Sequence, residues 1–421
     1  MTTLIFNFLS KNRKRKVQLS FIQSFCLFLL FITALQTNAQ TANGFLDFGT
    51  ATSNTTATTT NTGFGGVRVG TAGGGFTIQN PGQSIGINGE LRGIAPSSAS
   101  INSVGITSTE YGSASSLFTI SFDLHLSGGS SGIWYFFAGN GTSFATAQTS
   151  GFTSAQVFTG LRWTFGASNS ITTDYRSGTS WVSTGGTPFS QNTAYQVTII
   201  GNNGSSTINY GASNIYSVAA NRFDLWVNGV LVGNDLTKGA IGNTTAINAF
   251  RFYGELSTGN VAQIALDNVR WYNSCVLPPT HLNFVNVPST GSSSTNLSSY
   301  AVEARSGSNT GPIADQFTGV ITVSKFSGAG NLTGTLNPNA IAGVASYANS
   351  QFDAAGTYAL LASAAAPIVA DTSDNIVISG GGPCVPPSTQ ATSLNLVSPS
   401  STSIQADWTA GNGSGTMIVV R

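Results

Sequence analysis

The sequence predicts an all-β protein made of successive β-sandwich modules, and three observations support this prediction. Apolar and polar residues alternate with period two in many short segments, as in strands that bury one face. Glycine, of which there are 50, and asparagine separate these segments as turn residues. No segment shows an apolar pattern of helical period and length, and lysine and glutamate are rare. Many strands joined by turns, without helices between them, favour sandwiches.

The clearest hairpin lies at residues 222–235, RFDLWVNGVLVGND. Asn228 and Gly229 form a typical two-residue type I′ turn, because both residue types tolerate positive φ. The predicted cross-strand pairs, counted outward from the turn, are Val227–Val230, Trp226–Leu231 and Leu225–Val232. A two-stranded ribbon is at best marginally stable in water. We therefore expect this hairpin to belong to a larger sheet.

A second hairpin is predicted at residues 116–141, SLFTISFDLHLSGGSSGIWYFFAGNG. Apolar residues occupy every second position from Phe118 to Leu126, which is the pattern of a half-buried strand. The segment SGGSSG supplies the turn, and IWYFFAG returns as a mostly buried strand. The same spacing continues in GLRWTFGAS, ITTDYRS, AYQVTIIGNN, AFRFYGE and QIALDNVRWYN.

These two hairpins and the closing segment ALDNVRWYN resemble the concanavalin-like, laminin-G-type jelly-roll domain of secreted proteins. The resemblance covers about residues 41–274, and Asn228 stands where that family commonly has aspartate. It implies a jelly roll of two antiparallel sheets, which is often a carbohydrate-binding or adhesion module. A β-solenoid is the alternative for a chain rich in glycine, asparagine and threonine, but residues 41–274 show no fixed repeat.

Residues 1–39 have the features of a cleaved export signal. The basic segment 11–16, KNRKRK, precedes an apolar run at 21–35, and Thr37-Asn38-Ala39 resembles a cleavage site. The run is shorter than the ~20 residues of a membrane span. We therefore expect a secreted or cell-surface protein with no membrane span after cleavage.

Removal of this signal changes the net charge of the chain. The signal contains five of the 16 basic residues and none of the 15 acidic ones, which leaves 11 basic residues and a net charge of −4. A nucleic-acid-binding surface needs a basic footprint. Nucleic acid is therefore excluded as a partner.

Composition changes predict two linkers, at residues 275–280 (CVLPPT) and 380–390 (containing CVPPST). The module between them, 281–379, resembles bacterial Ig-like domains in its segment DAAGTYAL at 353–360. This resemblance implies a seven-strand sandwich of about 100 residues.

The last segment, residues 391–421, resembles the start of a fibronectin type III domain, with SLNLV, SIQADW and TMIVVR as its strands. The resemblance implies that Trp408 is the core tryptophan. Four further strands of such a domain would be missing, and about thirty residues cannot close a sandwich. We therefore expect the chain to be part of a longer protein or a truncated gene product.

Catalytic motifs are missing from the sequence. The histidines His125 and His281 fall in different predicted modules, and no G-x-S-x-G, H-E-x-x-H or clustered E-x-D-x-x-E occurs. The glutamates are isolated: Glu90, Glu110, Glu255 and Glu303. We expect these 421 residues to be non-catalytic.

Aromatic residues suggest carbohydrate binding, because flat rings stack on pyranose faces. The candidate platforms are Trp181, Tyr175, Tyr135 and Trp134, with Asp174 and Asn169 as partners for sugar hydroxyls. Trp163 and Trp271 are expected to be buried. We therefore expect adhesion or binding to an extracellular glycan or matrix polymer. Two alternatives are accessory modules of a secreted enzyme whose catalytic domain lies beyond residue 421, and a structural stalk or surface-layer protein.

Two further pairs of residues deserve structural tests. Asp47 and Asp267 would converge on a Ca²⁺ ion if the terminal strands of the jelly roll pair. The favoured alternative is that Asp267 and Asn268 hydrogen-bond a neighbouring turn. Cys275 and Cys384 could form a disulfide that stabilises the module by about 4 kcal/mol. A sandwich places its two ends farther apart than the ~7 Å that a disulfide spans, which argues against the bond.

Overall fold

The computed structural model describes residues 42–49, 54–79, 84–85, 89–145, 151–365, 368–380, 388–389 and 391–410. The predicted export signal, Cys384 and residues 411–421 lie outside the described residues. The described chain is almost entirely β-structure, and its α-helices are the single turns α2 (Thr59–Thr62) and α3 (Ser108–Tyr111). No helix in this part of the chain is long and apolar enough to cross a membrane. The prediction of an all-β protein is confirmed.

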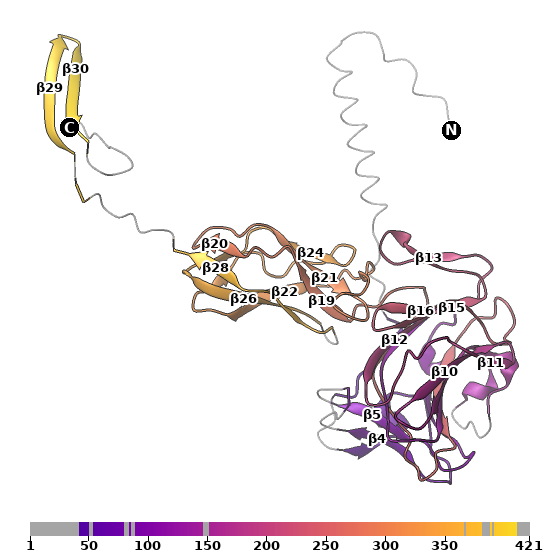
Figure 1. The fold of residues 1–421 in the computed structure, drawn as a ribbon. Coiled ribbons are helices and arrows are strands. Elements are labelled where there is room, and N and C mark those ends of the chain that lie inside the picture. The colour runs from indigo at the N-terminus through magenta and orange to yellow at the C-terminus, as the bar shows by residue number, and fades with distance from the viewer. Residues whose placement is uncertain are drawn as a thin grey trace, which may run out of the picture.

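Two large antiparallel sheets form the first sandwich (Figure 1). The nine-stranded sheet runs in the order β16 (Val230–Thr237), β15 (Arg222–Val227), β12 (Ala194–Asn202), β7 (Leu117–Ser127), β18 (Gln263–Tyr272), β5 (Glu90–Ile94), β4 (Gly75–Gln79) and β2 (Thr55–Thr56), with β1 (Gly44–Leu46) also paired to β18. The seven-stranded sheet runs β11 (Ser180–Ser183), β10 (Ile171–Ser177), β9 (Val157–Phe165), β8 (Ile133–Gly139), β17 (Ala249–Glu255), β6 (Asn102–Ile106) and β3 (Gly66–Arg68). Strands β13 (Ile208–Tyr210) and β14 (Tyr216–Val218) form a separate two-stranded sheet.

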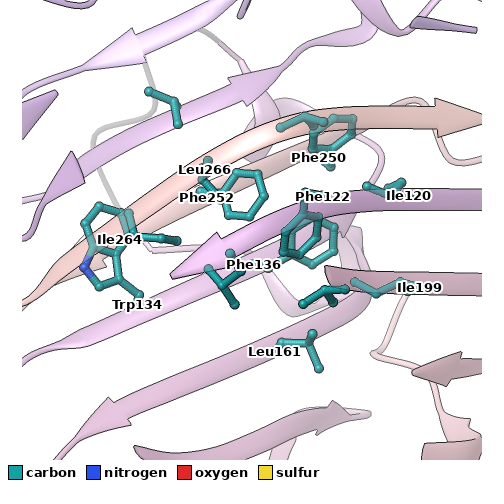
Figure 2. Close-up of a cluster of buried hydrophobic side chains, with 14 of the residues drawn as sticks. Ile120, Phe122, Trp134, Phe136, Leu161, Ile199, Phe250, Phe252, Ile264 and Leu266 are labelled. Atoms are coloured by element: carbon teal, nitrogen blue, oxygen red, sulfur yellow. The ribbon is translucent and has the colours of Figure 1, made fainter. Parts of the chain in front are cut away.

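The core between the sheets is rich in aromatic rings (Figure 2). Phe122 of β7 lies 5.4 Å from Phe136 of β8 and 4.9 Å from Phe252 of β17, measured between ring centroids. Trp163 and Trp271 are 0% and 3% exposed, so the prediction of their burial is confirmed. Two sheets that face each other through a continuous core form a sandwich and exclude the β-solenoid alternative.

The predicted Asn228–Gly229 turn joins β15 and β16, with φ values of 49° and 76°. The pairs Val227–Val230 and Trp226–Leu231 form as predicted. The prediction of a Leu225–Val232 pair is wrong, because Leu225 pairs with Gly233 after a register shift. Such an irregularity places an extra residue in one strand, which counting outward from the turn cannot detect.

The predicted linker 275–280 packs against the first sandwich. Val276 and Leu277 are buried, and the hydroxyl of Thr119 donates to the carbonyl of Ser274 at 2.8 Å. The Cys275 thiol is half-buried and has no disulfide partner among the described residues. The predicted Cys275–Cys384 disulfide stays a prediction, because Cys384 is not described.

Residues 281–380 form a second, smaller sandwich with its own core. One sheet contains β19 (His281–Val285), β21 (Tyr300–Arg305) and β24 (Val344–Tyr347). The other contains β20 (Thr290–Ser292), β28 (Ile376–Ser379), β26 (Gly356–Ala364) and β22 (Ile321–Ser327), with β27 (Asp371–Thr372) on β26 and a separate pair of β23 (Leu332–Thr333) and β25 (Gln351–Phe352). Strand β20 pairs with β28 in parallel, in contrast to the antiparallel pairs around it.

The last described element is a hairpin of β29 (Thr392–Ser400) and β30 (Ser403–Thr409). Leu394, Leu396 and Val397 are exposed to solvent, and Trp408 is 39% exposed. The predicted role of Trp408 as a core tryptophan stays a prediction, because the third predicted strand, TMIVVR, lies outside the described residues.

Candidate functional site

The outer face of the seven-stranded sheet carries a cluster of aromatic side chains. Side chains alternate along a strand, so Tyr135 and Phe137 of β8 point away from the core that holds Trp134 and Phe136. The Tyr135 and Phe137 rings stack with centroids 5.6 Å apart. Tyr253, opposite Tyr135 on β17, lies 5.0 Å from it.

Two other segments complete this aromatic cluster. Phe152, just before β9, stacks on Phe137 with centroids 4.2 Å apart. Trp181 of the edge strand β11 approaches Tyr135 to 5.6 Å. A cavity of about 160 Å³ opens between them, lined by Tyr135, Phe137, Gly151, Phe152, Ser154, Val157, Arg176, Trp181, Tyr253 and Glu255. We call it the aromatic cavity.

Glu255 provides the carboxylate of the aromatic cavity. It accepts hydrogen bonds from the hydroxyls of Tyr135 at 3.1 Å and Tyr253 at 2.5 Å. Burial and these contacts with Glu255 raise the pKa of both tyrosines far above its ordinary value. Both phenols therefore stay protonated, and each holds its ring in place through Glu255.

Two arginines flank the indole ring of Trp181. The guanidinium carbons of Arg162 and Arg176 lie 4.8 Å and 5.2 Å from its centroid, within the range of cation–π interactions. Arg162 forms an ion pair with Asp174 at 2.7 Å, and Arg176 donates to the Ser154 hydroxyl at 2.5 Å. The register produces this grouping, because Arg162 faces Asp174 and Arg176 faces Trp181 across neighbouring strands.

The structure brings together only some of the residues predicted from sequence. Trp181 and Tyr135 line the aromatic cavity, whereas Asp174 does not line it and forms an ion pair with Arg162, which lies over the Trp181 ring. The prediction of Trp134 as a platform is wrong, because its ring is 0% exposed on the inner face. Tyr175 also turns toward the core and packs on Phe223 at 6.1 Å, so it is not part of this cavity.

Asn169 lies elsewhere, in a separate polar cavity of about 350 Å³ at the loop ends. Sequence reasoning missed Tyr253, Phe152, Arg176 and Glu255. The alternation in AFRFYGE could have placed Tyr253 and Glu255 on one face, since they are two residues apart. No sequence pattern around Phe152 predicts that its ring lies on the outer face of the seven-stranded sheet.

The terminal strands β1 and β18 pair, which brings Asp47 and Asp267 into one region. Asp267 is buried and accepts a hydrogen bond from the Phe48 amide at 3.4 Å, while Asp47 accepts one from the Gly49 amide at 2.8 Å. Burial raises the pKa of Asp267 to about 7, and the nearby carboxylates of Asp123 and Asp47 add to the shift. Asn268 sits at a register shift with φ 51° and donates to Asp123 at 2.7 Å.

Within the described residues, no group of three or more His, Cys, Asp or Glu side chains is arranged to hold a metal ion. Backbone amides of the neighbouring turn already donate hydrogen bonds to the carboxylates of Asp47 and Asp267. We therefore expect the melting midpoint of the protein to stay unchanged when calcium or a chelator is added. Differential scanning calorimetry in 5 mM CaCl₂ and in EDTA measures this. A calcium-dependent rise of several degrees that disappears in Asp267→Asn would instead establish the Asp47–Asp267 ion site.

The two packed sheets and the aromatic cavity define an all-β sandwich protein with a candidate ligand site on the outer face of one sheet. No protein-family model matches the sequence, and no curated protein matches it. Among solved structures, the chain is similar to Trypanosoma rangeli sialidase in complex with the inhibitor DANA, at 13% identity and a TM-score of 0.30, over 55% of this chain and 30% of the sialidase.

Two other solved structures are also similar to this chain. One is the binding domain of botulinum neurotoxin DC in complex with rat synaptotagmin II, at 10% identity and a TM-score of 0.26, over 72% of this chain and 69% of that chain. The other is a legume lectin-like domain from Entamoeba histolytica, at 10% identity and a TM-score of 0.23, over 47% of this chain and 89% of that chain. Similarity at these TM-scores carries no argument for function, which has to come from the residues.

Proposed function

We propose that the protein is a secreted or cell-surface adhesion and binding protein that recognises an extracellular glycan in the aromatic cavity. The domain layout in this proposal is a jelly roll at 41–274, an Ig-like spacer at 281–379 and a fibronectin-type segment from 391. The aromatic cavity is the single observation that carries the proposal. It combines aromatic faces with hydrogen-bonding groups, which is the composition of saccharide sites.

The lining residues match the chemistry of a sugar ring. Trp181, Tyr135 and Phe152 offer apolar surface for the C–H face of a pyranose. Arg176 and the Ser154 hydroxyl lie at the same cavity and can form hydrogen bonds with sugar hydroxyls. A cavity of about 160 Å³ suits one or two sugar rings, and the rest of the glycan chain would extend out through the opening of the cavity.

Trp181→Ala is expected to weaken glycan binding at least about tenfold, since a central tryptophan often dominates a binding surface. A glycan array probed with the labelled wild-type protein identifies the ligand, and isothermal titration calorimetry of both proteins measures the affinity. Trp181 is half-buried on an edge strand, so the variant is expected to stay folded.

Trp408→Ala is the matched control, because Trp408 is a partly exposed tryptophan on a hairpin outside both sandwiches. We expect this variant to bind like the wild type. Equal affinity of the wild type and Trp181→Ala, or no binding to any glycan on the array, would contradict the proposal.

The same cavity is compatible with accessory modules of a secreted enzyme. Glycoside hydrolysis uses two carboxyl groups that flank the scissile bond. Among the described residues that line the cavity, Glu255 is the sole carboxylate, and two tyrosine hydroxyls occupy its oxygens. This arrangement favours binding over hydrolysis at this cavity.

A further inference from the structure

We propose that the sugar bound in the aromatic cavity is acidic and that Arg176 binds its carboxylate or sulfate group. This inference rests on the proposed glycan-binding function and specifies the class of glycan.

Positive charge is concentrated on the outer face of the seven-stranded sheet. Only 11 basic residues follow the predicted signal, in a sequence where acidic residues outnumber them. The strand register places four of these 11 residues on the outer face of the sheet: Arg68, Arg162, Arg176 and Arg251. Two carboxylates, Asp174 and Glu255, share the face. With four arginines and two carboxylates, the outer face of this sheet is a basic region of an acidic protein, which attracts anions.

Among the described residues, no carboxylate forms an ion pair with the Arg176 guanidinium. The ion pairs among the described residues are Arg162–Asp174 and Arg305–Glu303. Glu255 is occupied by the hydroxyls of Tyr135 and Tyr253. Within the part of the chain that the structure describes, the Arg176 guanidinium donates to the neutral Ser154 hydroxyl and lies over the Trp181 ring.

Two other arginines of this face, Arg162 and Arg251, have structural roles. Arg162 is neutralised by Asp174. Arg251 is fully buried and donates to the Ser103 hydroxyl and to the carbonyls of Phe144 and Ala145, which holds the short turn at Phe144 against the sheet. Arg176 is the arginine that lines the cavity itself.

The position of Arg176 suits a charged sugar. Its guanidinium lies beside the Trp181 ring, so a pyranose stacked on that ring would carry its carboxylate or sulfate next to the guanidinium. Burial and the charge of Arg162 lower the pKa of Arg176, which means that a bound anion would relieve an unfavourable charge environment. An arginine also binds carboxylates and sulfates through paired hydrogen bonds.

Paired ligands that differ only in charge test this inference on the full chain. One pair is oligogalacturonate and its methyl ester, and the other is a sulfated galactan oligosaccharide and its desulfated form. We expect the wild type to bind the acidic member of at least one pair about tenfold more tightly, and the advantage to shrink at 0.5 M NaCl. The pair that shows the difference identifies carboxylate or sulfate as the recognised group.

Arg176→Gln is expected to remove this preference, because the affinity for the acidic member falls much more than the affinity for the neutral member. Arg176→Lys, which keeps the charge, should retain part of the preference and serves as the second variant if Arg176→Gln does not fold. Arg92→Gln is the matched control, because Arg92 pairs with Gln263 on the other sheet.

Three outcomes would overturn the inference. Equal binding of acidic and neutral members in both pairs, or an array that shows only neutral ligands, overturns it and leaves the proposed function standing. An equal loss for both members in Arg176→Gln would show that Arg176 only shapes the cavity. Failure of every glycan to bind would contradict the proposed function itself.

Discussion

Trp134→Ala is expected to lower the free energy of unfolding of the first sandwich by about 3–5 kcal/mol. The indole ring lies in the core of the sandwich (Figure 2) and is fully buried. It packs edge-on against Phe76 and donates to the Ala262 carbonyl at 3.2 Å. Gly93 and Gly254 leave room for this ring, since a Cβ at either position would lie 2.8 Å from it. Urea denaturation followed by near-ultraviolet circular dichroism measures the loss.

Trp181→Ala is the control for this experiment, because its ring is half-buried and lies outside the core of the sandwich. We expect it to lower the free energy of unfolding by less than half as much. If Trp134→Ala kept its stability but lost glycan binding, Trp134 would be a ligand-binding residue and its placement in the core would be wrong.

Asp267→Asn is expected to stabilise the first sandwich above pH 7 by about 4 kcal/mol, from a pKa shift of about three units. Burial raises the pKa of Asp267 to about 7 from an ordinary value of 3.8, so the fold favours the protonated carboxyl. Its contribution to stability is complete below pH 4 and is lost as the pH rises to 7. Asparagine stays neutral and removes this dependence. Urea denaturation of both proteins at pH 4.5 and pH 8 measures the difference.

Both proteins contain the same other titrating groups. The difference between their free energies of unfolding therefore depends on Asp267 and on the titrating groups that face it. These are Asp123 on β7 and Asp47 after β1, whose charges raise its pKa, and Arg270, whose charge acts on Asp123. Asp353→Asn is a control of opposite sign, because hydrogen bonds from Asn331 lower the pKa of the exposed Asp353. An equal effect of Asp267→Asn at both pH values would contradict the predicted pH dependence.

Local patterns were sufficient to predict most strands of the first sandwich. Period-two alternation located β7 and β8, and Asn228–Gly229 located the β15–β16 turn. The predicted Leu225–Val232 pair was wrong because of a register shift. In a ribbon that is apolar on both faces, such a shift does not change the pattern of apolar and polar residues, so the sequence cannot reveal it.

The candidate site was less predictable, because it depends on which face each aromatic residue occupies. Trp134 and Tyr135 are neighbours in a run of apolar residues, and only the packing of the second sheet decides which one is buried. The cavity also joins β8, β10, β11 and β17 with the segment around Phe152. These segments are far apart in the sequence, and the sheet order that brings them together is not encoded in any local motif.

The parallel pair β20–β28 has a consequence for a protein under tension. Residues Thr290–Ser292 and Ile376–Ser379 lie near the start and the end of the second sandwich, and amides of Val377 and Ser293 extend their hydrogen bonds at 2.9 Å each. A force that separates the two ends pulls these strands in opposite directions along their length. It loads their hydrogen bonds together in shear, whereas an antiparallel pair at this position would unzip one bond at a time. The second sandwich therefore has a strand geometry that resists forced unfolding, a process governed by the unfolding rate.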